Sequence, residues 1–179
     1  MFKSLGGMVI ALVLCAGAQA ADQSLSAEAN AKFLQDNSKQ KGVVTRPDGL
    51  RYLIIQNGSG KRPTLNDSVE VYYTGKLING EVFDGTEDGF PRTFETKGLI
   101  SGWKEALQIM REGDHWELFI PASLAYGAAG SRDGSVPPNQ TLVFDLHLLG
   151  VTAKSPQQLE AEQAEKARDE ASHPGPGAE

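Results

Sequence analysis

Apolar residues recur at three- and four-residue steps over residues 99–110, in a chain whose neighbouring segments alternate instead. The residues that fall on one helical face are Ile100, Trp103, Leu107 and Met110. Gly102 stands where the chain is expected to turn into this helix, and Gly113 follows soon after its end. A single short helix between strand-like runs can bury its apolar stripe only against a sheet. The pattern therefore predicts a sheet packed on one central helix.

Alternation of apolar and polar residues predicts strands on both sides of this helix. The clearest strand covers residues 69–77, where Gly75 falls on the apolar face. Asn79 and Gly80 then predict a hairpin turn. Further strands are expected at 50–56, from 81–83 onward, at 93–96, at 115–120 and at 142–148. The predicted fold class is α+β, with five or six antiparallel strands around one short helix.

The last predicted strand has an apolar and a polar face. Phe144 and Leu146 point inward, whereas Asp145 and His147 point outward. We interpret His147 as a solvated surface histidine. Because the three histidines are scattered along the sequence, and the one cysteine is near the N-terminus, no metal site and no cofactor are expected.

The first twenty residues have the features of a secretory signal peptide. Lys3 precedes an apolar run at 8–14, and a small-x-small cleavage site ends at Ala20. The apolar run is too short to span a bilayer. The large Leu14 before Cys15 argues against a lipoprotein anchor. The mature protein is expected to begin after Ala20 and to be periplasmic or secreted.

Both ends of the remaining chain differ from its middle. Residues 24–41 are helix-prone with a thin apolar stripe, and residues 157–171 are polar on every face. The latter segment is either a solvated helix or disordered. We therefore divide the chain into a signal peptide (1–20), an N-terminal helical arm (21–45), a globular domain (46–152) and a polar tail (153–179).

The net charge of −6 argues against nucleic acid or an anionic membrane surface as a partner. A hydrolase is also disfavoured, because the sequence has no Gly-x-Ser-x-Gly motif and no prominent acidic pair.

Five short motifs stand in the same order as in the FKBP-type peptidyl-prolyl isomerases, which the stretch 42–151 resembles. They are Val-Tyr-Tyr-Thr-Gly at 71–75, Val-Phe-Asp at 82–84, Ile-Ser-Gly-Trp at 100–103, Leu-Ala-Tyr-Gly at 124–127, and Val-Pro-Pro at 136–138 with Thr-Leu-Val-Phe-Asp at 141–145. The lead-in at 42–45 and 49–52 is most similar to the bacterial macrophage infectivity potentiator (Mip) branch. Proteins of that branch dimerise through a longer helical arm, so the short arm here predicts a monomer or a weak dimer.

The resemblance implies a half-barrel sheet wrapped around the helix, with an apolar pocket between them. Its implied lining is Tyr73, Phe83, Trp103 and Phe144, and its implied rim is Leu99, Ile100 and Val136. Asp84, the hydroxyl of Tyr126 and the backbone N–H of Ile100 would be the polar groups that act on the substrate. The implied substrates are proline-containing segments of exported polypeptides, with a folding-chaperone or virulence-associated role, and the same pocket is expected to accept macrolide inhibitors.

Such a pocket can act without a nucleophile, a metal or a proton shuttle. Rotation about an X–Pro amide has a barrier near 20 kcal/mol, because the half-rotated bond loses resonance. The planar amide is the more dipolar form, so transfer to a dry pocket penalises it more than the twisted form. A millionfold acceleration needs roughly 8 kcal/mol. One donor in a dry site contributes about 3 kcal/mol, so desolvation and strain must supply the remainder.

Several alternatives remain open from the sequence. Trp103 alone is most simply a large core residue, and the whole domain could be a barrel whose aromatic side chains fill its interior. Asp84 could accept hydrogen bonds from the backbone or Tyr73 and hold the pocket's shape instead of acting on the amide. The pocket could also belong to a non-catalytic chaperone module that only binds proline-containing segments.

Overall fold

The computed structural model describes residues 23–87 and 89–172. The predicted signal peptide and the end of the polar tail lie outside these residues. In chain order the helices and strands are α1 (Ala27–Asn37), β1 (Val43–Thr45), β2 (Arg51–Gln56), β3 (Ser68–Leu77), β4 (Val82–Gly85), β5 (Arg92–Glu95), α2 (Ser101–Leu107), β6 (His115–Ile120), β7 (Leu142–Thr152) and α3 (Pro156–Ser172). Short 3₁₀ turns occur at Gln23–Leu25, Thr96–Gly98, Ala122–Leu124 and Gly127–Ala129.

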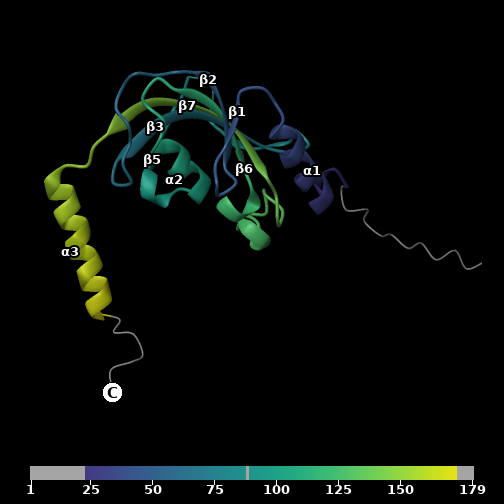
Figure 1. Cartoon of the computed structure of the whole chain (residues 1–179). Coiled ribbons are helices and arrows are strands. Elements are labelled where there is room, and N and C mark those ends of the chain that lie inside the picture. Colours follow the sequence, from purple (N-terminus) through teal and green to yellow (C-terminus); the bar gives the residue numbers. More distant parts are fainter. Residues whose placement is uncertain (1–22, 88, 173–179) are drawn as a thin grey trace, which may run out of the picture.

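All seven strands form one antiparallel sheet in the order β1-β2-β6-β7-β3-β4, and β5 also pairs with β3. The sheet curves over α2, which lies against its concave face (Figure 1). This arrangement confirms the predicted α+β half-barrel. The strand that the sequence analysis did not assign is β1, a three-residue segment that pairs with β2.

Helix α2 covers less than the predicted stretch 99–110. It begins at Ser101, because Leu99 and Ile100 are still extended. Its buried face includes Trp103 and Leu107, as its apolar spacing predicts. The reason for Gly102 differs from the predicted one. This glycine lies inside the helix, and a Cβ there would be 2.5 Å from Cγ2 of Ile120 on β6.

The alternation along the central strands produces the core. On β3 the inward residues Val69, Val71 and Tyr73 are buried, and the neighbouring β7 buries Phe144 and Leu146. Each fully buried aliphatic side chain contributes about 1.5–3 kcal/mol relative to an exposed one. These strand residues and the buried face of α2 form one cluster, so the core lies between α2 and the concave face of the sheet.

Helix α1 covers the outer face at one end of the sheet. Ser26 is its N-cap and accepts a hydrogen bond from the N–H of Ala29 at 3.1 Å. The ring of Phe33 lies 6.1 Å from that of Phe119 on β6, centroid to centroid. Phe119 is therefore buried, although it points to the outer face of the sheet, where the other residues of β6 are polar. The N-terminal arm is helical as predicted, over a shorter range than 24–41.

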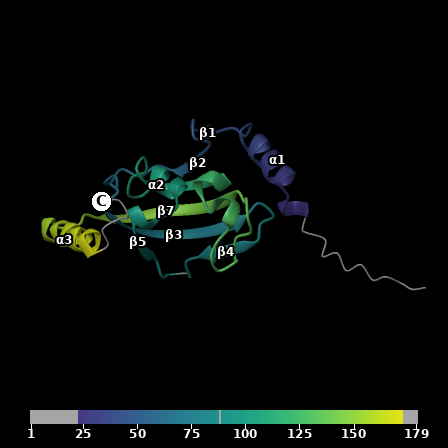
Figure 2. The same ribbon diagram turned by 90° about the horizontal axis from the view of Figure 1, so that it is seen from below.

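Helix α3 extends away from the sheet at the other end of the molecule (Figures 1 and 2). Its Glu162 forms ion pairs with Lys97 and, at 2.7 Å, with Lys154. Of the two alternatives for this polar segment, the structure selects the solvated helix. Among the described residues, no helix combines the length and apolar character needed to span a bilayer.

Candidate functional site

A cavity of about 230 Å³ opens between α2, the inner face of the sheet and the loop that follows β6. Its lining consists of Tyr73, Phe83, Asp84, Phe94, Gly98, Leu99, Ile100, Trp103, Tyr126 and Phe144. The structure thus brings together all of the predicted site residues except Val136. Aromatic side chains form most of its wall, so the side of a bound group that lies against this wall would be removed from water.

The aromatic floor is built from edge-to-face contacts around Trp103, whose side chain is buried. The ring centroids of Tyr73 and Phe144 each lie 5.2 Å from that of Trp103, with interplanar angles of 90° and 83°. Gly75 lies directly opposite Phe144 in the sheet. A Cβ at Gly75 would be 2.7 Å from Phe144 and 2.8 Å from Phe83. The absence of a side chain at Gly75 therefore leaves space for the rings of Phe83 and Phe144, which form the wall of the cavity.

Asp84 is the carboxylate of the pocket, and both of its oxygens are engaged. The hydroxyl of Tyr73 donates to Oδ2 at 2.6 Å, and the N–H of Gly85 donates to Oδ1 at 2.8 Å. Burial, followed by the hydrogen bond to Asp84, raises the pKa of Tyr73 above its usual range. Tyr73 therefore stays a neutral donor at neutral pH. These contacts favour the positioning role for Asp84 over a direct action on the amide.

Arg92 belongs to the same polar cluster, which the sequence analysis did not anticipate. Its Nη1 donates to the hydroxyl of Tyr73 at 3.1 Å and lies 3.3 Å from Oδ1 of Asp84. Phe94 and Gly98 also line the cavity. The alternation of β5 signalled that Phe94 points inward. The interaction of Arg92 depends on the pairing of β5 with β3, which has no local signal.

Several donors at the cavity have no protein acceptor within the described residues, and Nε1 of Trp103 is one of them. Within the described residues, neither the N–H of Ile100, which precedes the first turn of α2, nor the hydroxyl of Tyr126 forms a hydrogen bond. Burial, with a smaller effect of the negative charges of Asp84 and Asp133, raises the pKa of Tyr126. Tyr126 is therefore protonated at neutral pH and, like Ile100, can donate to a carbonyl oxygen of a bound peptide.

The structure places Val136 away from the rim expected for it. Its side chain is 2 % exposed and is part of the core. Its N–H donates to Oγ of Ser131 at 2.8 Å, and its C=O accepts from the N–H of Ser131 at 2.9 Å. Asp133 closes this loop by accepting hydrogen bonds from Ser131 and Ser135, which lower its pKa to about 2. The side chain of Val136 therefore packs into the core beneath this loop and does not face the cavity.

The comparison with protein families identifies the class to which this fold and cavity belong. Residues 60–149 match the model of the FKBP-type peptidyl-prolyl cis-trans isomerase, and residues 14–54 match the domain amino terminal to it. The chain therefore belongs to the FKBP-type peptidyl-prolyl isomerase family.

Individual relatives place the chain near the Mip proteins, as its lead-in motifs predicted. It is 50 % identical over 120 residues to the outer membrane protein MIP of Legionella longbeachae, covering 66 % of this chain and 51 % of the relative. It is 45 % identical over 130 residues to the peptidyl-prolyl cis-trans isomerase Mip of Coxiella burnetii, covering 72 % and 56 %. The crystal structure of FkpA from Escherichia coli superposes with a TM-score of 0.67 at 40 % identity, covering 70 % of this chain and 59 % of that chain. The chain spans about half the length of the curated relatives it matches.

Proposed function

We propose that this chain is a peptidyl-prolyl cis-trans isomerase that accelerates rotation of X–Pro bonds in polypeptides. The observation that carries the proposal is the open aromatic cavity floored by Trp103. Its own side chains do not fill it, so a pyrrolidine ring has a place to bind. The family membership supports the same activity.

The lining determines how the cavity would act. Among the described residues that line it, none is a histidine, cysteine, serine or lysine, and its one carboxylate, Asp84, is already engaged by Tyr73 and the N–H of Gly85. Enclosure by aromatic rings removes water from the amide and thereby destabilises its planar, dipolar form. Donation from Ile100 N–H and the Tyr126 hydroxyl then holds the peptide so that the bond can twist.

The polar cluster of Asp84, Tyr73 and Arg92 has a positioning role in this proposal. Because Asp84 is engaged by Tyr73 and by the N–H of Gly85, it fixes the ring of Tyr73 against Trp103. Asp84→Leu is therefore expected to lower activity by loosening that wall. Unchanged activity in Asp84→Leu, with unchanged stability, would exclude Asp84 from the site and leave the desolvation mechanism intact.

The activity is tested with a proline-containing tetrapeptide in a protease-coupled assay. The wild-type chain is expected to accelerate isomerisation, and Tyr126→Phe to reduce kcat/KM by about tenfold to a hundredfold. This loss is smaller than for a donor in a dry site, because Tyr126 is 39 % exposed. Tyr72→Phe is a matched control, because Tyr72 faces the opposite side of β3 and lies outside this cavity. Full binding of the peptide without any acceleration would instead support the non-catalytic chaperone.

We further propose the setting in which this activity operates. The leader at 1–20, with cleavage after Ala20, makes the protein periplasmic or secreted, where exported polypeptides are its substrates. The Legionella relative is an outer membrane protein, which is consistent with export. The same cavity would accept macrolide inhibitors, and the short arm containing α1 would allow at most a weak dimer.

A further inference from the structure

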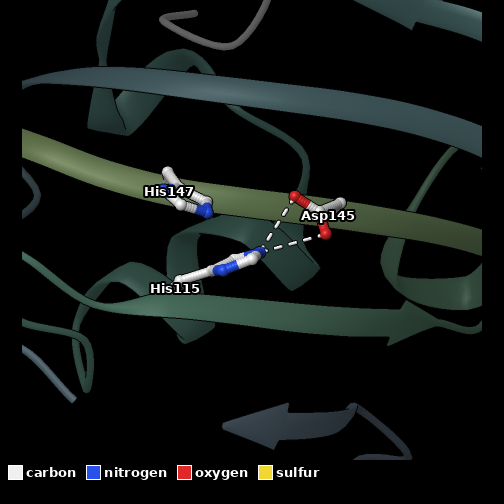
Figure 3. Close-up of side chains that lie close together, drawn as sticks. All are labelled: His115, Asp145 and His147. Carbon is white, nitrogen blue, oxygen red and sulfur yellow. Dashed lines mark hydrogen bonds and ion pairs between the residues drawn. The ribbon is translucent and has the colours of Figure 1, made fainter. Parts of the chain in front are cut away.

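A second cluster of side chains lies on the outer face of the sheet, on the side of β7 opposite the cavity. His115 comes from β6, and Asp145 and His147 come from β7, at the centre of the sheet (Figure 3). The alternation along this strand predicts a solvated surface position for His147. It does face outward, but it is half-buried, because its ring centroid lies 3.5 Å from that of His115.

The ligand-bearing atoms of the three side chains converge. His115 Nε2 is 3.0 Å from each carboxylate oxygen of Asp145 (Figure 3). One ring nitrogen of each histidine and one oxygen of Asp145 all lie within 4.8 Å of one another. Ligands about 2.0–2.2 Å from a tetrahedral ion are about 3.4 Å apart. Small side-chain rotations, without movement of the backbone, would therefore complete a three-ligand arrangement.

The sheet holds this arrangement in place. His115 and His147 are directly opposite each other in the β6–β7 ladder, and Asp145 is two residues before His147 on the same face. Directly opposed residues have Cβ atoms about 4.5–5.5 Å apart. The cluster is thus built on two central strands rather than on loops, which favours a preorganised site.

The cluster is also accessible. The side chain of Asp145 is 49 % exposed and that of His115 is 18 % exposed. A hollow of about 390 Å³ opens onto Asp145 and His147 and is lined as well by Thr74 and Glu87. An ion could enter from this side and keep a water molecule as a fourth ligand. Among the described residues, this is the one group of three potential ligands that meets in this way.

We propose that His115, Asp145 and His147 form a binding site for one divalent transition-metal ion of the Zn²⁺ type. Two imidazoles and one carboxylate are a ligand set that such ions prefer over Mg²⁺ or Ca²⁺, which favour oxygen ligands alone. The bound ion would join β6 to β7 on the face opposite the proposed isomerase cavity.

The alternative is that His115 and Asp145 form an ordinary ion pair with His147 packed beside it. A structural pair of this kind would affect stability equally with and without metal. A metal site instead predicts a stability gain that depends on added Zn²⁺ and on all three side chains. This difference separates the two explanations.

The test titrates the untagged chain with Zn²⁺ by calorimetry and measures thermal unfolding with and without Zn²⁺. We expect one Zn²⁺ per chain, and His115→Gln, His147→Gln and Asp145→Asn each to weaken its affinity by about tenfold or more. The rise in Tm on adding Zn²⁺ should be lost in the same three variants. Replacement of Zn²⁺ by Co²⁺ should give visible absorption bands that these variants also lose.

The control is His173→Ala, because His173 is the remaining histidine of the sequence and lies outside the described residues. This variant should bind Zn²⁺ with the wild-type affinity. The proposal is overturned if Zn²⁺ does not bind saturably, if His115→Gln and His147→Gln bind it as the wild type does, or if His173→Ala removes the binding.

Discussion

Two asparagines on the same helix illustrate how burial acts on single polar residues. Asn30 and Asn37 of α1 are 6 % and 1 % exposed. Asn30 donates to Oε1 of Gln140 at 3.0 Å and accepts from the N–H of Thr141 at 2.7 Å. The amide of Asn37 has no hydrogen-bond partner within the described residues. The cost of burying the side-chain amide is therefore offset by hydrogen bonds at Asn30 but not at Asn37.

This difference leads to a paired prediction for the same substitution. Asn30→Ala should reduce the free energy of unfolding by about 1–3 kcal/mol, because it leaves the Thr141 N–H and Oε1 of Gln140 without their hydrogen-bond partner. Asn37→Ala should change the free energy of unfolding by less than about 1 kcal/mol or increase it, because the substitution removes a buried amide group that makes no hydrogen bond. Urea unfolding of both variants measures the difference. Equal losses would show that α1 is held by packing rather than by the hydrogen bonds of Asn30.

At the scale of elements, the position of α2 depends on how closely it approaches β6. Gly102 permits this approach, since a Cβ would contact three side-chain atoms of Ile120 at 2.5 to 3.1 Å. Trp103 follows directly, so any displacement of the start of the helix also moves the floor of the cavity. The contact between one glycine and one isoleucine therefore couples the fold to the proposed site.

Gly102→Ala should lower the free energy of unfolding by about 1–3 kcal/mol, although alanine favours a helix, because the added methyl group overpacks the contact with Ile120. In the double variant with Ile120→Ala the methyl group gains space. The two losses should then be less than additive by about 0.5–3 kcal/mol in a double-mutant cycle. Gly98→Ala is the control, because a Cβ at Gly98 meets nothing within 4 Å. Strictly additive losses would contradict the close contact.

At the scale of the whole molecule, the two terminal helices attach to the sheet in different ways. Helix α1 is docked by buried groups, including Asn30 and the Phe33–Phe119 contact. The described contacts of α3 are mainly ion pairs, centred on Glu162 with Lys97 and Lys154. The attachment of α1 is expected to be insensitive to added salt, whereas salt should weaken the attachment of α3 by screening its ion pairs. The helices should therefore differ in how much they contribute to the stability of the domain.

Deletion of residues 156–179 should change the free energy of unfolding of the domain by no more than about 1 kcal/mol, because Lys154 keeps its ion pair with Glu95 and the pair of Lys97 with Glu162 is at the surface. The proposed isomerase activity should be retained, since none of the side chains of α3 that the structure describes lines the cavity. The measurement is urea unfolding of the full and shortened chains, together with the tetrapeptide assay. A loss much greater than this would show that α3 stabilises the sheet in another way.

The sequence by itself determined most of the elements and the face that each of them buries. Strand β6 has the predicted bounds, and Tyr73, Trp103 and Phe144 point inward as their periodicity requires. This succeeded because the apolar period is local, so that an amphipathic segment shows which face it buries. The resemblance to the family then supplied the pocket and the residues expected to line it.

Only the tertiary structure decided which distant residues touch. It brought Arg92 onto Tyr73 and buried Val136 in the core. It also set His147 against His115. These contacts depend on the pairing and register of strands that are far apart in the chain. A local hydrophobic pattern carries no information about that register, so it could place each side chain on a face of the sheet but could not name its neighbour.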